Sequence, residues 1–258
     1  MKIDVIQLRG RASHRDAAWA VRQMIQRSEE FGHDIHFPED VYGSASVARS
    51  RNLSLMKVRD DSDFVLFIDD DMIPEPGALN SLIKHDAAVA SALCVSRSFP
   101  PSLNARLLLD GKFTEIVPEA VIGRVVQGTF AFGFGFVLVK RSFLREIVEY
   151  VLSGRDWLQL NINMLNRLNV RSETRERERL RIEVVRREKY AAEKFVPVFQ
   201  ENLNDDQNLV SEDFHFSLLV MALGVEVVLD ASVLVGHMGD FPYTIHHCNI
   251  NSPAKVKL

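Results

Sequence analysis

The stretch from Phe64 to Pro74 constrains the fold of this chain more than any other part of the sequence. It begins with five apolar residues in a row, and three acids follow at once: Asp69, Asp70 and Asp71. An apolar run without a polar face is typical of a strand that is buried on both sides of a mostly parallel sheet. The acids are therefore expected at the carboxyl end of that strand, where ligands bind in open α/β sheets.

These three acids predict a metal site. Adjacent carboxylates repel one another unless protons or a cation neutralise them, and a divalent metal is the simplest neutraliser. Hard oxygen ligands suit Mg²⁺ or Mn²⁺, which take one or two carboxylates and complete their shell with water and substrate phosphates. On an extended strand end Asp69 and Asp71 point to one side, while Asp70 points to the other. A turn with a helix cap is the alternative, because Asp is common in both.

Strand and helix patterns alternate along the first part of the chain. Strands are expected at 3–8 and 33–37, and helices at about 13–31 and 44–58. This order predicts an α/β fold with a mostly parallel sheet flanked by helices. Later elements are expected as a short helix opened by Pro74 and Pro76, strands at 87–95 and 136–139, and a helix at 141–152.

The middle of the chain has a different character. Short strands with turn signals between them are expected at 107–109, 113–117 and 121–126, which indicates a smaller mixed or antiparallel part. Gly133 and Gly135 follow among phenylalanines. Glycine there permits positive φ or the close approach of another backbone or a ligand. Relief of crowding among the aromatic rings is an equally good interpretation.

Two segments complete the pattern. Residues 171–190 carry eight Arg or Lys and five Glu, a local charge of 8 − 5 = +3, which predicts a protruding, solvated helix. There are two alternatives: a partner helix, which would form a homo-oligomer through residues 170–195, and an acceptor-binding arm. Ser211 then opens a helix, and a strand is expected at 225–229. The apolar side of that helix is expected to consist of Phe214, Leu218, Met221 and Ala222.

Composition sets the broad class. With 258 residues and 47% hydrophobic content, the chain can bury a large core as one domain, or as one domain with an appendage. A net charge of −4 gives no global attraction to nucleic acid or to an anionic membrane. Two cysteines cannot form a disulfide framework, so we expect a buried Cys94 thiol and a cytoplasmic protein. No signal peptide and no membrane span are expected from the hydropathy pattern.

The order of several short motifs along the chain resembles the GT-A glycosyltransferases, most of all their small inverting, family-two-like branch. The motifs are a basic loop after the first strand, Ala48-Arg49-Ser50-Arg51-Asn52, Phe67-Ile68-Asp69-Asp70-Asp71, Gly133-Phe134-Gly135-Phe136, Ser211-Glu212-Asp213-Phe214 and Val235-Gly236-His237. They cover about residues 3–139 and 209–239, and residues 150–208 are not covered. The resemblance implies a GT-A-like domain over 1–258, with a nucleotide-binding half at 1–100. It also implies an acceptor or catalytic half at 101–149 and 209–240, and a helical insertion at 150–208.

The resemblance also implies roles for single residues. Asp69 and Asp71 would hold Mn²⁺ or Mg²⁺ against the diphosphate of a nucleotide-sugar donor, and His237 would complete the metal site. Asp213 of the Glu212-Asp213 motif would be the general base. Further contacts to the nucleotide are expected from Arg9, Arg49, Arg51, Asn52, Asp69, Asp70, Arg97, Gly133 and Gly135.

Simpler interpretations stand beside these roles. Asp213 lies in a first helical turn, where any acid is favoured by the helix dipole. A histidine after an apolar strand is more often packed or hydrogen-bonded than bound to metal. A metal-dependent glycosyltransferase is the leading hypothesis, with a saccharide, a lipid-linked glycan, a protein or a modified nucleic acid as acceptor. A metal-dependent nucleotidyltransferase and a non-catalytic nucleotide- or sugar-binding module are the alternatives.

Overall fold

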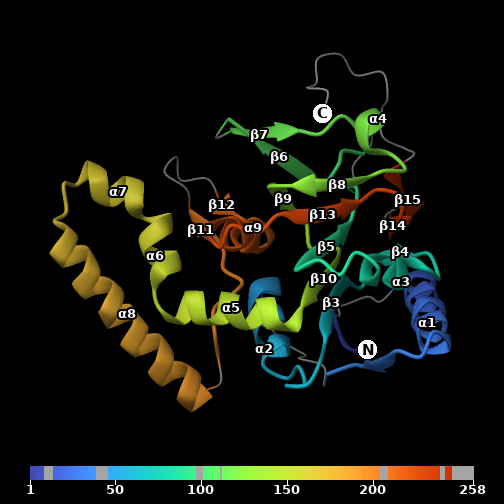
Figure 1. Cartoon of the computed structure of the whole chain (residues 1–258), viewed down its shortest axis with the longest axis horizontal. Helices are drawn as coiled ribbons and strands as arrows, with labels where there is room; N and C mark the ends of the chain where they lie inside the picture. Colours follow the sequence, from blue (N-terminus) through green and yellow to red (C-terminus); the bar gives the residue numbers. More distant parts are fainter. Residues whose placement is uncertain are drawn as a thin grey trace.

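The computed structural model describes residues 1–8, 14–38, 46–96, 101–110, 112–193, 195–203, 209–238 and 242–245. Within these residues a seven-stranded sheet forms the centre of the molecule, with helices on both faces (Figure 1). Its strand order is β2 (Asp34–His36), β1 (Lys2–Leu8), β3 (Phe64–Asp69), β10 (Phe136–Lys140), β5 (Val89–Ala92), β13 (Val227–Asp230) and β8 (Val125–Gly128). All except β10 and β8 run in one direction. The predicted α/β fold with a mostly parallel sheet is confirmed.

The strand β3 lies inside the sheet, and its five apolar residues are buried, as the sequence predicts. It pairs in parallel with β1, so that Leu8 and Asp69 stand side by side at the carboxyl edge. Its side chains alternate between two cores, one containing Val65 and Phe67 and the other containing Phe64, Leu66 and Ile68. Burial on both faces leaves the acids after Ile68 as the first polar groups of this segment.

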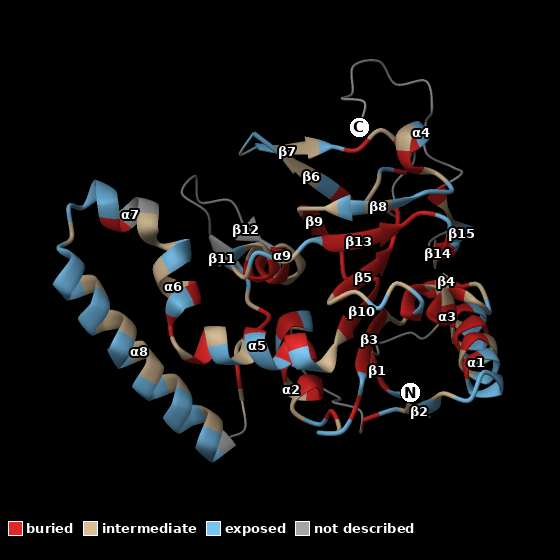
Figure 2. Ribbon diagram, in the orientation of Figure 1, coloured by how far each residue is buried: buried red, intermediate tan, exposed pale blue. Residues whose placement is uncertain are grey.

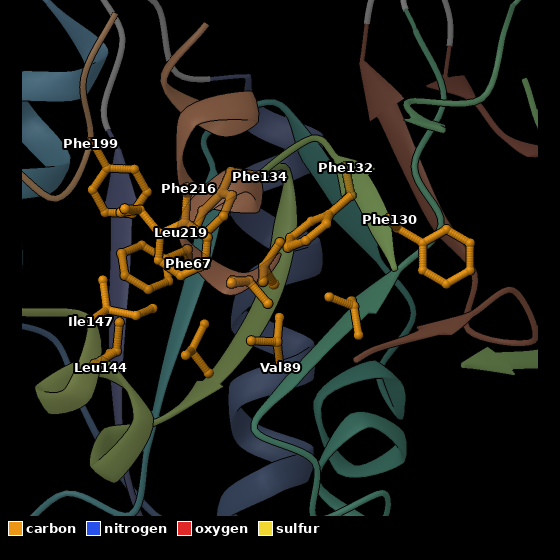
Figure 3. Packing of buried hydrophobic residues seen from close by; sticks show 14 of the residues in the cluster. Phe67, Val89, Phe130, Phe132, Phe134, Leu144, Ile147, Phe199, Phe216 and Leu219 are labelled. Carbon is orange, nitrogen blue, oxygen red and sulfur yellow. The ribbon is translucent and has the colours of Figure 1, made fainter. Parts of the chain in front are cut away.

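Each core is closed by its own helices. The helices α1 (Arg15–Glu30) and α3 (Ala78–Ile83) cover the face with Leu66, while α2 (Val47–Leu55), α5 (Arg141–Leu152) and α9 (Glu212–Ala222) cover the face with Phe67. The core that contains Phe67 is rich in aromatic rings, as Figure 3 shows. The rings of Phe67, Phe199 and Phe216 lie 4.6–5.1 Å from that of Phe134 and meet it edge to face. Such contacts add about 0.5–1.5 kcal/mol each beyond area burial.

Smaller sheets flank the central one. The strands β7 (Lys112–Glu115), β6 (Ala105–Leu109) and β9 (Phe130–Phe132) form an antiparallel sheet, which confirms the expected mixed part in the middle of the chain. A second small sheet consists of β15 (Pro242–Tyr243), β14 (Val235–Met238) and β4 (Met72–Pro74). The strands β11 (Asn202–Leu203) and β12 (Leu209–Val210) pair with each other.

Two local predictions in these regions are wrong. The segment 121–126 is a strand only from Val125 on, because α4 (Pro118–Val121) and a turn precede β8. Pro118 occupies the start of α4, where its fixed φ suits a helix and its missing N–H costs nothing. Pro74 does not open a helix but ends β4, which pairs with β14, and the helix starts only at Ala78.

The buried face of α9 also differs from the predicted one. Phe216, Leu219 and Val220 are buried together with His215 and Ser217. The predicted residues Phe214, Leu218, Met221 and Ala222 are partly or fully exposed. Apolar residues occur around the whole helix, so the periodicity does not select a side. Ser217 can be buried because it donates to the Asp213 carbonyl at 3.0 Å and accepts from the Phe132 N–H at 3.2 Å.

The charged segment forms a long helix at the side of the molecule, as predicted. The helices α6 (Arg155–Leu160), α7 (Ile162–Arg167) and α8 (Ser172–Glu193) lie beside α5 and α9, and most of α8 is exposed (Figures 1 and 2). Arg186 attaches α8 to the rest through the buried carboxylate of Asp156 and the carbonyl of Val151. An interface between copies through this helix stays a prediction. None of the helices in the described ranges is long and apolar enough to cross a membrane.

The glycines of the loop before β10 are explained by close packing. A Cβ on Gly135 would lie 2.7 Å from the end of the Met72 side chain, and a Cβ on Gly133 would lie 1.8 Å from the amide of Asn104. Cys94, 3.5 Å from the Gly135 position, is buried, and burial raises the pKa of its thiol to about 12. Side chains of the protein itself therefore fill the space that the absent Cβ atoms leave.

Gly135→Ala and Gly133→Ala should differ in their effect on stability. Met72 is buried in the core, so the added methyl at Gly135 overpacks it and should lower the free energy of unfolding by about 1–3 kcal/mol. Asn104 is exposed and its amide can rotate away, so the change at Gly133 should cost less than about 1 kcal/mol. Urea denaturation of the two variants measures the difference, and equal losses would contradict this packing.

Candidate functional site

The guanidinium of Arg51 joins acids from two distant parts of the chain. Its Nη2 donates to Asp69 Oδ1 at 3.0 Å, and its Nη1 donates to Glu212 Oε1 at 2.9 Å and to Asp213 Oδ1. Arg51 is only 2% exposed, so the charge has little water around it. The three acids raise its pKa although burial opposes them, and the guanidinium stays charged. The end of β3 and the start of α9 are therefore held against one cation.

The surroundings fix this arginine in place. Arg51 is carried by α2, and its guanidinium lies 5.1 Å from the ring centre of Phe134 and 5.7 Å from that of Phe199. Cation–π contacts of this kind stabilise a desolvated guanidinium. The next residue, Asn52, donates to the Phe199 carbonyl at 2.7 Å and accepts from the Phe199 N–H at 2.8 Å. Phe199, which follows α8 in the chain, thus forms part of the wall around Arg51.

Asp213 is oriented through both of its oxygens. Oδ1 meets Arg51, and Oδ2 accepts a hydrogen bond from the backbone N–H of Phe134 at 3.1 Å. Its side chain keeps 23% of its surface exposed and lines a cavity. Glu212 is 13% exposed, is not among the residues that line this cavity, and has its pKa raised by burial and by the charge of Asp213. Of the two acids, Asp213 is the one that a ligand in the cavity meets.

The carboxyl group of Asp69 has a raised pKa. Loss of water around the carboxylate raises its pKa to about 6, with Arg51 opposing the shift and Asp213 adding to it. Asp71 contributes a further increase. The negative charge at the strand end is therefore in excess of what one guanidinium neutralises, which favours binding of a cation.

Asp71 and His237 lie together on the other side of the strand end. His237 is on β14, next to β4, and its Nε2 is 3.3 Å from Asp71 Oδ2. Its Nδ1 is 2.7 Å from the Val95 carbonyl oxygen. A carbonyl can only accept, so Nδ1 carries a proton and, in the neutral ring, Nε2 presents a lone pair to the carboxylate. A cation or a second proton between these two atoms makes the contact favourable.

This geometry fits a metal in part. Asp71 and His237 offer an oxygen and a nitrogen with the outer nitrogen of the histidine already bonded, as is usual for metal-binding histidines. Asp69 is turned to Arg51 instead, and no group of three His, Cys, Asp or Glu side chains arranged around a metal is found in the described part of the chain. Mg²⁺ or Mn²⁺ needs only one or two protein carboxylates when substrate phosphates supply further oxygens.

Two cavities lie next to acids of this region, one lined by Asp70 and the other by Asp213. One has a volume of about 440 Å³, lies against α1, and is lined by residues that include Gln7, Gln26, Phe37 and Asp70. The other has a volume of about 470 Å³ and is lined by residues that include Asn104, Asp213 and Phe214. Asp70 therefore faces a different space from Asp213. The alternation expected for an extended strand end does not apply, because β3 ends at Asp69 and residues 70 and 71 form a turn, with Asp69 facing Arg51 and Asp71 facing His237.

The remaining predicted residues divide into three groups. Arg9 and Arg97 lie outside the described residues. Arg49 is exposed on α2 and is free to face a ligand, whereas Arg51 and Asn52 are used within the protein, so that their contact with a nucleotide stays a prediction. Asn104 and Phe199 were not expected at the site. No local motif marks them, because their positions depend on contacts with residues far along the chain.

Comparisons with known proteins give only distant similarities. No protein-family model and no curated protein matches the chain. Among solved structures it is similar to a glycosyltransferase involved in the glycosylation of the major capsid of PBCV-1, with 9% identity and a TM-score of 0.34 over 57% of this chain and 63% of that one. It is also similar to Drosophila β1,4-galactosyltransferase 7 bound to manganese, UDP-Gal and xylobiose, with 16% identity and a TM-score of 0.31 over 57% and 51%.

A third solved structure belongs to another class of enzyme. It is 4-diphosphocytidyl-2C-methyl-D-erythritol synthase from Anaerococcus prevotii, with 11% identity and a TM-score of 0.37 over 58% of this chain and 76% of that one. The chain spans less than two thirds of the length of both glycosyltransferases above. Similarity at this level assigns no activity, which has to be argued from the residues of the site.

Arg51→Met tests whether the guanidinium holds the site together. Removing one partner of a buried ion pair costs about 3–5 kcal/mol, and we expect the free energy of unfolding at pH 8 to fall by that amount. Burial already raises the folded-state pKa values of Asp69 and Glu212, and they rise further without the opposing charge of Arg51. Such groups contribute stability at low pH that is lost as the pH rises, so the deficit should shrink toward pH 5.

Urea denaturation at several pH values measures this deficit. Arg49→Met, an exposed change on the same helix, is the matched control and should have little effect at any pH. A small, pH-independent loss for Arg51→Met would contradict the central role of this arginine.

Proposed function

We propose that this chain is a metal-dependent glycosyltransferase that moves a sugar from a nucleotide-diphosphate sugar to an acceptor hydroxyl. One observation carries the proposal: Arg51 joins Asp69, at the end of β3, to Asp213, and two separate cavities reach this cluster, one lined by Asp213 and one lined by Asp70, the neighbour of Asp69. A transferase with two substrates needs such an arrangement, with a donor on one side, an acceptor on the other and charge control between them.

The cavity beside α1 suits the nucleoside of the donor. Its walls are mostly apolar, with the ring of Phe37 and the side-chain amides of Gln7 and Gln26. A nucleobase presents apolar faces and a polar edge, which these groups match. Asp70 lines the same cavity and can accept a hydrogen bond from a ribose hydroxyl.

Asp71 and His237 are the residues that would hold the metal, with Asp69 beside them. A bound divalent metal would stabilise the negative charge that develops on the leaving diphosphate. Since metal binding requires a carboxylate and a neutral imidazole, it should weaken as the pH falls.

Asp213 is the residue best placed to accept the proton of the acceptor hydroxyl. Its exposed surface lies in the second cavity, and the Arg51 and Phe134 contacts fix its orientation. Each carboxylate oxygen can accept more than one hydrogen bond, so these contacts leave room for an acceptor hydroxyl. A base on the acceptor side of the sugar supports direct displacement with inversion.

Product analysis tests the proposal against its main alternative. The chain is incubated with a panel of nucleotide sugars and Mn²⁺, first without acceptor and then with a mixture of saccharides. Release of a nucleoside diphosphate supports glycosyl transfer. Release of pyrophosphate from a nucleoside triphosphate would identify a nucleotidyltransferase. No turnover, combined with binding of the nucleotide sugar, would indicate a non-catalytic binding module.

Two substitutions of His237 separate its structural and metal-binding roles. His237→Asn keeps a nitrogen near the position of Nδ1, which can still bond the Val95 carbonyl, whereas His237→Gln keeps one near Nε2 and loses that bond. We expect the Asn variant to keep the apo melting temperature but to lose Mn²⁺-dependent stabilisation by nucleotide sugar in a thermal-shift assay. We expect the Gln variant to lower the apo melting temperature.

Asp71→Asn should lose the same Mn²⁺ response while its apo stability stays level or rises, because carboxylate repulsion is relieved. A full Mn²⁺ response in both the Asp71→Asn and His237→Asn variants would remove these residues from a metal site.

Asp213→Asn and Glu212→Gln form a matched pair, since both acids contact Arg51 but only Asp213 lines the cavity. As the base, Asp213 contributes to transfer and not to donor binding. Asp213→Asn should therefore lower turnover by roughly two to four orders of magnitude with nearly unchanged affinity for the nucleotide sugar. Glu212→Gln should lower it far less. Equal and small effects on turnover would show that Asp213 is not the base.

A further inference from the structure

The cavity that contains Asp213 has walls from three elements. The β6–β9 pair contributes one side, the start of α9 contributes another, and the loop before β10 lies between them. Its volume of about 470 Å³ lies within the roughly 300–1,000 Å³ that is usual for small-molecule sites. The cavity is large enough for one or two sugar rings or a group of similar size.

The lining of this cavity combines polar side chains with aromatic rings. Asn104, Arg106 and Ser211 supply polar side chains besides Asp213, while Phe132 and Phe214 supply aromatic surface. The ring of Phe214 is held by Phe113 at a centroid distance of 4.8 Å in an edge-to-face contact. Hydroxyl-binding groups beside a fixed aromatic ring match a sugar, which has a polar edge and an apolar face.

Asn104 is the polar residue of this lining whose backbone is bonded on both sides. Its N–H donates to the Cys94 carbonyl at 2.9 Å, and its carbonyl accepts from the Gly133 N–H at 2.8 Å. Its side-chain amide lies directly over Gly133, where a Cβ would be 1.8 Å from Nδ2. No hydrogen bond of this amide to any described residue is found, and the side chain is exposed in the cavity.

The loop before β10 ties this amide to the carboxylate of Asp213. Gly133 bonds the backbone of Asn104, and the next residue, Phe134, donates its N–H to Asp213 Oδ2 at 3.1 Å. Two consecutive residues thus set the spacing between an amide that can bind one hydroxyl and a carboxylate that can bind another. Neighbouring hydroxyls on a sugar ring present such a pair of groups.

We propose that this cavity binds a saccharide acceptor and that Asn104 positions it, by hydrogen bonding a hydroxyl next to the one that faces Asp213. The role of this saccharide as the acceptor rests on the proposed function, but binding of the saccharide itself does not depend on it. An apolar lipid chain would leave the polar groups of the cavity unpaired, and a peptide backbone would not need an aromatic face beside a row of hydroxyl-binding groups.

Saturation-transfer NMR with a set of methyl glycosides tests binding directly. The glycosides of glucose, galactose, mannose, xylose and N-acetylglucosamine are the probes, and a serine-containing tetrapeptide is the competing class. We expect at least one glycoside to bind. Asn104→Ala should weaken that binding about tenfold, as loss of a hydrogen bond to a neutral hydroxyl predicts. Asn166→Ala, an exposed change on α7, is the control and should change nothing.

Gly133→Ala provides an independent test that leaves Asn104 unchanged. The added methyl occupies the place of the amide and pushes it away, so this variant should weaken glycoside binding by a similar factor. In transfer assays both variants should raise the KM for the saccharide about tenfold, while the KM for the nucleotide sugar stays within about twofold. A matching change in the KM of the donor would instead show that Asn104 acts on the nucleotide side.

The outcomes keep this inference apart from the proposed function. Glycoside binding that depends on Asn104, without any turnover of nucleotide sugars, would support the saccharide site and contradict the transferase. Three outcomes, each combined with turnover of nucleotide sugars, would overturn the saccharide site and leave the transferase standing. They are no glycoside binding, glycoside binding that neither variant changes, and binding of the tetrapeptide alone.

Discussion

The ion pairs of Arg51 are the interaction on which the rest of this structure depends. A buried guanidinium must be neutralised, and here three carboxylates from β3 and α9 surround it. The acids outnumber the cation, so the cluster keeps a negative excess. Burial raises the pKa of Asp69, and the charge of Asp213 adds to this increase. One set of contacts therefore joins two halves of the chain and leaves the edge of the sheet ready for a further positive charge. Stability and cation binding are coupled through the same arginine.

Much of the fold follows from local patterns. The five apolar residues before Asp69 could only be satisfied inside a sheet, and alternating strands and helices around them fixed its mostly parallel character. The exceptions have physical causes. Apolar residues around all of α9 hid its buried side, since Ser217 and His215 turn inward where Phe214 does not. Residues 121–126 read as a strand, yet Pro118 starts a helical turn just before them.

The site was predictable to a smaller extent. The acids at the strand end could be located because a strand carries them to the edge of a sheet regardless of what else is there. The use of Arg51 could not be predicted, because its partner Asp213 is 162 residues away and no short-range pattern records that distance. Asn104 was missed for the same reason, although the glycine at position 133 was a signal that a side chain passes close to the backbone there.

The reversed direction of β10 has a consequence for how the site is built. Parallel strands bring only their final residues to the edge where Asp69 lies, whereas β10 enters the sheet from that edge and brings its first residues there. Its preceding loop donates the Phe134 N–H to Asp213 and offers the Gly135 carbonyl to the Asp69 N–H at 3.1 Å. Two consecutive residues of one loop therefore contact both acids through backbone atoms, so the backbone shares with Arg51 the task of setting the distance between them. Side chains that line the cavities can therefore be replaced while this backbone contribution to the spacing of the two carboxylates is kept.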